Sequence, residues 1–167
     1  QTSAPSQAAF FEAFEPYDDI LFISISSKLS ASNQNGQIAA LTLPNKKVHV
    51  IDSMNLSTGI GLLVIKAAEM RDQGKSSDQI ADELNATVGH VNTSFVIDTL
   101  DYLYKGGRCS AIEMVFGSML KIRPVIEVKQ DGTLAVKEKI SGTRKKALDS
   151  MLIDFKSKLP KVDLHRV

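Results

Sequence analysis

The chain has 167 residues, of which 43% are hydrophobic, and its formal net charge is +1. This composition is sufficient for the core of one domain or of two small ones. A charge so close to zero gives no general attraction to nucleic acid or to anionic membranes, so we expect neither as a partner.

Chain length and cysteine usage also bear on location. The single cysteine, Cys109, cannot form an internal disulfide, which fits a reducing cytoplasm. No apolar run reaches the length of about 18 residues that a membrane span needs, so we expect no integral membrane segment.

The histidines His49, His90 and His165 lie far apart without cysteine or acidic partners at ligand spacing. We therefore expect no metal site.

Predicted helices and strands alternate in the first half of the chain. Helices are expected at residues 5–17, 30–43, 58–73 and from 76 onward, and strands at 20–25 and 47–51. Ser3 is the expected cap of the first helix, Gly74 ends the third, and Ser76 starts the fourth. Helices between successive apolar strands indicate a parallel α/β layer with right-handed crossovers.

The pattern changes after about Gly89. Strands are expected at residues 92–97, 125–129 and 134–139, and helices at 100–104, 111–120 and 143–159. The turn Gln130-Asp-Gly132 between two strand patterns predicts a β-hairpin. The fold class is therefore α/β plus α+β, with an α/β domain over residues 1–89 and an α+β domain over residues 90–167.

A serine-rich segment separates the first predicted strand from the next helix. The apolar run from Ile20 to Ile25 is followed by hydroxyl side chains at Ser26, Ser27, Ser30 and Ser32. Hydroxyl groups and unpaired N–H groups at a helix start suit an anion. These residues alone favour the simpler interpretation, in which Ser30 is an ordinary helix cap and Thr2 a turn residue before Pro5.

Four segments in order carry a family resemblance. They are Thr2-Ser-Ala-Pro-Ser6, Ile25-Ser-Ser-Lys-Leu-Ser30, Val50-Ile-Asp-Ser53 and Asp98-Thr-Leu-Asp-Tyr-Leu-Tyr-Lys-Gly-Gly-Arg108. In their order and spacing they resemble the DegV family of bacterial fatty-acid-binding proteins, along nearly the whole chain. The resemblance implies a DegV-like two-domain fold, in which a parallel three-layer α/β/α domain precedes a smaller two-layer domain with a mixed, largely antiparallel sheet.

The resemblance also implies a ligand site. Thr2 and Ser30 would hold the carboxylate of a long-chain fatty acid, with Ser27 and then Ser26 as further candidates. Arg108 would contact a partner kinase or a phosphate group. The acyl chain needs an apolar lining, for which the candidates are Ile112, Val115, Phe116 and Met119, although such a helical stripe is also typical of an ordinary core.

The implied function is that of a cytoplasmic fatty-acid carrier. It would bury the acid and present the carboxyl group to a fatty acid kinase subunit, which makes acyl-phosphate for phospholipid synthesis. The carrier would perform no chemistry itself and would need no cofactor besides the bound acid. Family segments expected before Thr2 and after His165 are missing from this sequence, so we interpret the chain as a fragment or truncated member that could self-associate.

Two other functions stay open. The chain could be an interaction fragment without a ligand. It could also be a serine-dependent hydrolase, which would need a histidine base near its nucleophile. No Gly-x-Ser-x-Gly motif is present, and His49 lies inside a predicted strand.

Overall fold

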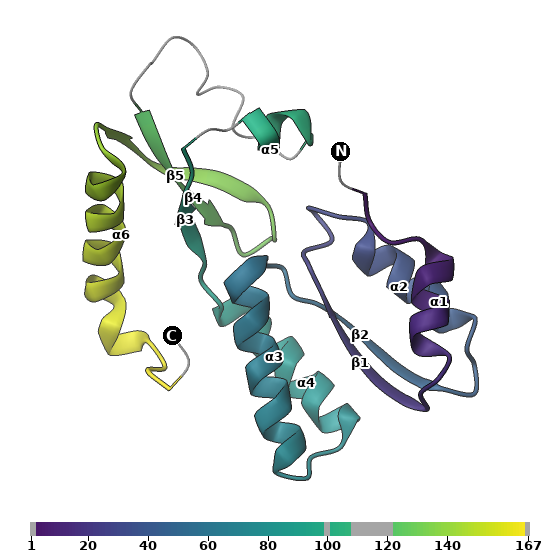
Figure 1. Ribbon diagram of the computed structural model, residues 1–167. Helices are drawn as coiled ribbons and strands as arrows, with labels where there is room; N and C mark the ends of the chain where they lie inside the picture. Colours follow the sequence, from purple (N-terminus) through teal and green to yellow (C-terminus); the bar gives the residue numbers. More distant parts are fainter. Residues whose placement is uncertain (1–2, 99–100, 108–121, 166–167) are drawn as a thin grey trace. The chain divides into compact units, whose positions relative to one another are not determined.

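The computed structural model describes residues 3–98, 101–107 and 122–165, with the elements labelled in Figure 1. Contacts between residues divide the chain into two compact units. The first is Gln1–Val91 with the turn Gln130–Thr133, and the second is Asn92–Lys129 with Leu134–Val167. One sheet is parallel and the other antiparallel, so the predicted fold class is confirmed. The domain boundary between residues 89 and 90 stays a prediction.

The sheet of the first unit consists of β1 (Asp19–Ser24) and β2 (Lys47–Asp52). The strands are parallel and in register along their whole length, from Asp19 opposite Lys47 to Ser24 opposite Asp52. The prediction of parallel neighbours is therefore confirmed. Because both strands end at the same level, the loops that follow Ser24 and Asp52 begin side by side.

One face of this sheet is covered by α1 (Gln7–Phe14) and α2 (Ser32–Leu41). Alternation along β1 directs Ile20 and Phe22 to this face. The ring centroid of Phe22 lies 4.9 Å from that of Phe10 and 5.8 Å from that of Phe14. Buried residues of this layer are Phe10, Phe14, Ala39 and Leu43, with Ile20, Phe22 and Val48 packed against them.

The start of α1 differs from the prediction. Its cap is Ser6, whose Oγ accepts a hydrogen bond from Ala9 N at 3.1 Å, so the assignment of Ser3 was wrong. The chain turns into the helix only after Pro5, and the hydroxyl that reaches the first turn is therefore that of Ser6. The Pro5 carbonyl instead accepts a hydrogen bond of 2.7 Å from Asn35 Nδ2 in α2.

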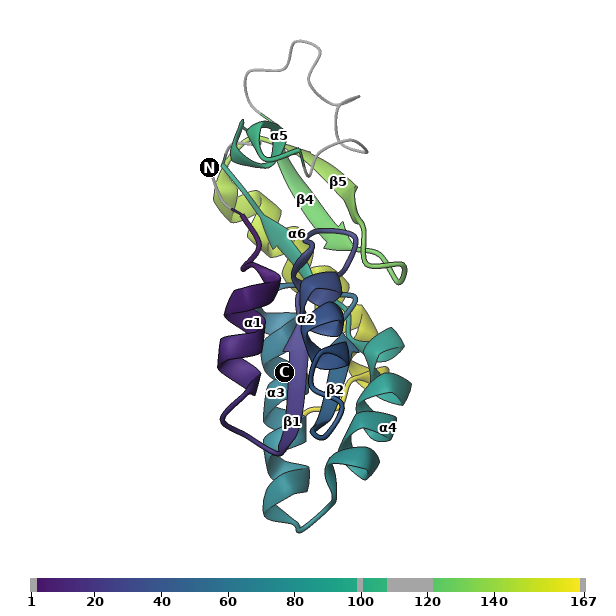
Figure 2. The same cartoon turned by 90° about the vertical axis from the view of Figure 1, so that its right-hand side faces the viewer.

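The opposite face of the sheet is covered by α3 (Ser57–Asp72) and α4 (Ser77–Thr87), and a 3₁₀ turn at Val88–His90 follows (Figure 2). Leu21 and Ile23 of β1 point to this side. The buried residues here are Ile51, Leu63, Ala67, Met70, Ile80, Ala81 and Leu84. The β1–β2 layer thus lies between two helical layers.

The connection from α3 to α4 uses the two signals expected from the sequence. Gly74 adopts a left-handed φ of 80°, and Lys75 N donates to Met70 O at 3.1 Å, which closes the end of α3. Ser76 then caps α4 in a capping box: its Oγ accepts from Gln79 N at 3.4 Å, and Gln79 Oε1 accepts from Ser76 N at 3.0 Å.

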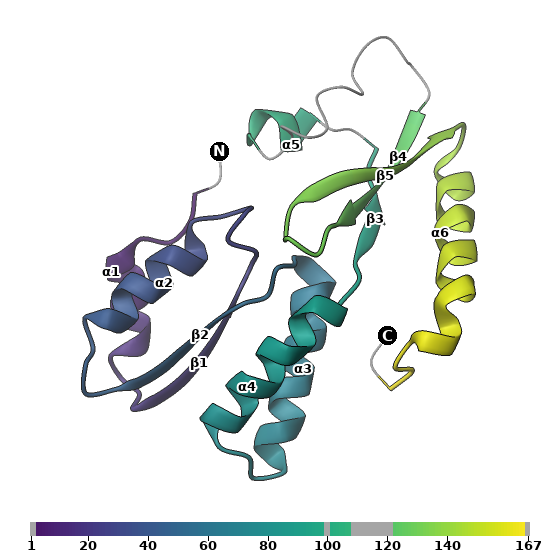
Figure 3. The ribbon, with the colours of Figure 1, turned by 180° about the vertical axis from the view of Figure 1, so that it is seen from behind.

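The second unit contains an antiparallel sheet in the order β3 (Ser94–Val96), β4 (Ile122–Val128) and β5 (Leu134–Ser141) (Figure 3). The helix α5 (Asp101–Lys105) follows β3. Strands β4 and β5 form the predicted hairpin, and Gly132 in its turn has a φ of 80°. β4 starts three residues earlier than predicted and includes the buried Pro124, which pairs with Lys139.

The long helix α6 (Arg144–Lys158) contacts β3 and β4, and the 3₁₀ turn Leu159–Lys161 follows it. Ala147 is fully buried. Asp154 ties the helix to the sheet: its Oδ2 lies 2.5 Å from Lys137 Nζ in β5 and 2.9 Å from Lys158 Nζ. Hydrogen bonds from Lys137 and then Lys158 hold the pKa of Asp154 below its usual value.

The close contact between α2 and β1 gives a first prediction. A Cβ added at Gly36 would lie 2.7 Å from Phe22 Cε1, and the Phe22 ring is confined by Phe10 and Phe14. We expect Gly36→Ala to destabilise the protein by about 1–3 kcal/mol in chemical denaturation, although alanine favours helices.

Gly61 in α3 is the matched control, because a Cβ there meets nothing within 4 Å. Gly61→Ala should stabilise the protein by about 0.5–1 kcal/mol. Equal effects of the two substitutions would contradict the close packing of α2 on Phe22.

The anchor of α6 gives a second prediction, on pH. Because the folded state lowers the pKa of Asp154, the carboxylate adds stability above its unfolded-state pKa, and this stability is lost as pH falls through the lower folded value. Asp154→Asn should lower the free energy of unfolding by only about 0.5–1 kcal/mol at pH 7, because Asp154 is partly exposed and solvent screens its ion pairs.

The difference in unfolding free energy between wild type and Asp154→Asn should shrink toward zero below a pH of about 4. Asp149→Asn is the control, because Asp149 pairs with Lys145 on the exposed side of α6 and should matter less. A difference that stays constant with pH would rule out the ionic anchor.

Candidate functional site

The residues 25–31 between β1 and α2 form a loop that we call the serine loop. Ser30 is partly buried, its N donates to Ser26 O at 3.2 Å, and its Oγ accepts from Ser32 N at 3.2 Å. The formal N-cap of α2 is Ala31, which has no side-chain oxygen, so the Ser30 hydroxyl takes over one of the first-turn N–H groups.

Ser30 and Ser32 form a hydroxyl pair at the amino end of α2. Their Oγ atoms lie 2.9 Å apart, and either can donate to the other. A hydroxyl has one proton to donate, so one member of the pair donates within it and the other keeps a proton for an outside acceptor. The start of a helix also favours negative charge. The pair can therefore donate to an anionic oxygen.

The other two serines of the loop have different environments. Ser27 is exposed, and its backbone N donates to Asp52 Oδ1 and Oδ2 at 3.2 and 3.3 Å. Ser26 is fully buried, its Oγ donates to Gly132 O at 2.8 Å, and it also accepts from Lys28 N. The Ser26 hydroxyl therefore has its proton committed to a backbone carbonyl.

The loop after β2, residues 53–56, lies beside the serine loop and was not assigned a role from the sequence. Asn55 is 2% exposed and its carbonyl accepts from Ser26 N at 2.8 Å. The Asn55 side chain donates to Val91 O and accepts from Leu56 N, each at 3.0 Å. Asn55 thus joins the two loops. The sequence signal was the group of polar residues Asp52, Ser53 and Asn55 directly after an apolar stretch.

A second buried polar link holds the start of α2. Asn33 Nδ2 donates to Ser24 Oγ at 2.9 Å, and Ser24 Oγ donates to Ile51 O at 3.2 Å. Both side chains are less than 5% exposed. This chain of bonds fixes the first turn of α2 against the ends of both strands, and with it the hydroxyl pair.

The remaining candidates from the sequence are Thr2, Arg108, Ile112, Val115, Phe116 and Met119, which lie outside the described residues. The convergence of Thr2 with Ser30 and the lining of an acyl tunnel therefore stay predictions.

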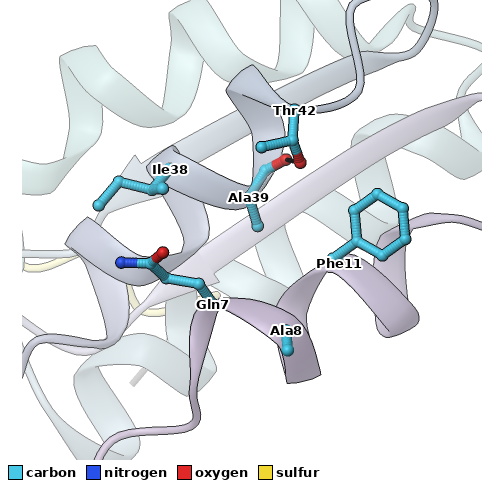
Figure 4. A pocket seen from close by; sticks show the side chains of 6 residues that line it. All are labelled: Gln7, Ala8, Phe11, Ile38, Ala39 and Thr42. Carbon is cyan, nitrogen blue, oxygen red and sulfur yellow. Dashed lines mark hydrogen bonds between the residues drawn. The ribbon is translucent and has the colours of Figure 1, made fainter.

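An apolar groove of about 340 Å³ lies between α1 and α2 (Figure 4). It is lined by Gln7, Ala8, Phe11, Ile38, Ala39 and Thr42. The Thr42 hydroxyl donates to Ala39 O at 2.7 Å, so its proton is committed to the helix itself. We assign the groove no part in holding a carboxylate.

His49 does not contact the serine loop. Its Nε2 lies 3.0 Å from Asp78 Oδ1 without the alignment of a hydrogen bond, and Asp78 also pairs with Lys47. The hydrogen bond from Lys47 holds the pKa of Asp78 below its usual value. A serine–histidine pair of the hydrolase type is therefore not formed by His49.

No cluster of three or more His, Cys, Asp or Glu side chains suitable for a metal ion occurs in the described ranges. Within that same part of the chain, every helix is too short or too polar to cross a membrane.

Comparison with known proteins identifies the family. The family model described as "Uncharacterised protein, DegV family" matches residues 1–162. The chain therefore belongs to the DegV family, as its sequence motifs predicted.

Relatives and solved structures agree with this assignment. A DegV domain-containing protein of Clostridium acetobutylicum is 39% identical over 150 residues, which cover 87% of this chain and 53% of that protein. A structure titled as fatty acid binding of a DegV family protein from Thermus thermophilus is 31% identical, with a TM-score of 0.80 over 94% of this chain and 56% of that chain.

A third similar structure is the fatty acid kinase B3 protein of Streptococcus pneumoniae, loaded with linoleic acid. It is 31% identical, with a TM-score of 0.79 over 91% of this chain and 56% of that chain. The chain spans about half the length of the relatives it matches.

The buried side chain of Asn55, which fastens the loop after β2 to Val91, gives a third prediction. Asn55→Asp would replace the donor to Val91 O by a second acceptor and bury a charge beside a carbonyl. We expect a loss of about 2–4 kcal/mol at pH 7 in chemical denaturation. Burial raises the pKa of a carboxyl group, so the loss should be smaller at pH 5.

Asn35→Asp is the matched control, because Asn35 Nδ2 also donates to a backbone carbonyl, that of Pro5, but at an exposed position. Its cost should be below about 1 kcal/mol. If both variants lose the same stability, the buried hydrogen bond from Asn55 to Val91 does not stabilise the loop after β2.

Proposed function

We propose that this chain binds a long-chain fatty acid, with the acid's carboxylate at Thr2 and Ser30 and with Ser27 as an additional contact. The observation that carries the proposal is the Ser30–Ser32 hydroxyl pair at the amino end of α2. It is supported by the fatty acids named for the similar proteins of Thermus thermophilus and Streptococcus pneumoniae.

The chemistry of the serine loop suits this ligand. A carboxylate has only acceptor oxygens and needs converging donors. The hydroxyl pair supplies one O–H, and Thr2 would supply another. The loop follows the carboxyl end of a parallel strand, which is where open α/β sheets bind ligands.

The acyl chain needs an apolar environment away from the serine loop. We propose that Ile112, Val115, Phe116 and Met119 line it. Flexible methionine and aromatic side chains adapt well to a long, bent hydrocarbon chain.

We further propose that the protein acts as a carrier in the cytoplasm and presents the carboxyl group of its acid to a fatty acid kinase subunit. Support comes from the kinase named for the Streptococcus pneumoniae relative. Arg108 would contact the kinase or the phosphate group, since a guanidinium suits both. The carrier would supply binding and orientation, and the kinase would carry out the phosphoryl transfer.

The proposal predicts that the purified chain retains a fatty acid in native mass spectrometry. Ser30→Ala should weaken palmitate binding by about ten- to a hundredfold in a titration, because it removes a hydrogen bond to a charged group.

Ser77→Ala is the control, since Ser77 Oγ donates to Asp19 at the amino end of β1, away from the serine loop. It should leave the affinity unchanged. Unchanged affinity in Ser30→Ala would contradict the assigned carboxylate site, and a wild-type chain that retains no acid would contradict the proposed function.

A further inference from the structure

The Asp52 carboxylate contacts the backbone of two loops of the first unit. Asp52 is the last residue of β2. Its Oδ1 accepts hydrogen bonds from Ser27 N at 3.2 Å and from Met54 N at 3.0 Å, and its Oδ2 lies 3.3 Å from Ser27 N. One carboxylate therefore binds a backbone N–H group of the serine loop and one of the following loop.

The loop after β2 is strained where Asp52 holds it. Met54 in this loop has a left-handed φ of 47°, and so does Ser57 at the start of α3, although neither is a glycine. Such residues cost about 1–2 kcal/mol each and persist where surrounding contacts fix them, which is frequent at ligand sites. Here the hydrogen bond from Met54 N to Asp52 fixes the first of them.

The contact with Ser27 has a consequence for an anionic ligand. A backbone N–H group in an exposed loop next to a helix start would otherwise be a donor for an anion. Asp52 accepts a hydrogen bond from Ser27 N, so this N–H group is occupied and the negative charge of the Asp52 carboxylate lies next to it. The Ser27 N–H group is therefore withheld from a ligand carboxylate, which is left with the hydroxyl groups of the loop, that of Ser30 among them.

We propose that Asp52 is a positioning residue, which clamps the serine loop through Ser27 N and the adjacent loop through Met54 N. By this clamp it selects a single carboxylate position at Ser30. The inference rests on the proposed function for the ligand, whereas the clamp itself does not depend on it.

The clamp is tested without any ligand. In Asp52→Ala, hydrogen exchange measured by NMR should speed up about tenfold or more at the Ser27 and Met54 amides. Asp52→Asn keeps one acceptor oxygen and should give a smaller increase. If both amides exchange as slowly in Asp52→Ala as in wild type, Asp52 does not clamp the two loops and this part of the proposal is wrong.

The positioning role is tested with two ligands of equal chain length, palmitate and hexadecanol. A positioned carboxylate site favours the acid, so the ratio of the two affinities should fall about tenfold in Asp52→Ala. Ser77→Ala is the control: it removes a hydrogen bond to Asp19 at the amino end of β1, away from both loops, and should leave the affinity ratio unchanged.

Faster exchange with an unchanged affinity ratio would show that Asp52 is merely structural and would overturn the positioning role. If wild type binds neither palmitate nor hexadecanol, the proposed function fails, and with it the selection of a carboxylate. The exchange measurement would still decide whether Asp52 clamps the loops.

Discussion

The in-register parallel pairing of β1 with β2 is the constraint on which the first unit depends. Because Ser24 lies opposite Asp52, two loops that are remote in sequence start at the same level of the sheet. This brings Ser26 N to Asn55 O and Ser53 N to Ser24 O. A shift by one residue would turn every side chain of a strand to the other face and would break both contacts. The register therefore determines the core and the candidate site together.

Much of the fold could be predicted because its signals are local. The apolar run of β1, the glycine at Gly74 and the turn at Gly132 each act through the residues next to them. Helix starts were harder to predict. Ser3 and Ser6 are equally good capping residues, and only the path of the chain around Pro5 selects Ser6. The start of β4 at Ile122 was missed because Pro124 argues against a strand in sequence alone.

The candidate site was predicted only in part, for a physical reason. Ser30 was recognised because it lies in a motif that carries the family resemblance, where a strand, a serine-rich turn and a helix follow one another along the chain. Asp52, Asn55 and Asn33 were missed because their roles arise from hydrogen bonds between different elements, to Ser27, Val91 and Ser24. Such hydrogen-bond partners are determined by the strand register and by the path of the chain between elements, and not by the spacing of residues along the sequence. The donors of the serine loop are therefore readable from sequence, and the groups that orient them are not.

The residues that connect α3 to α4 form hydrogen bonds with near neighbours in the sequence, whereas the two strands of the first unit pair over a much longer distance along the chain. The glycine that ends one helix and the serine that begins the other act within a few residues, through Met70, Lys75 and Gln79. Pairing of β1 with β2, in contrast, has to close a loop that contains the whole of α2. Loop closure costs entropy that near neighbours avoid. We therefore expect the connection between α3 and α4 to form more readily than the pairing of β1 with β2, because its contacts close much shorter loops.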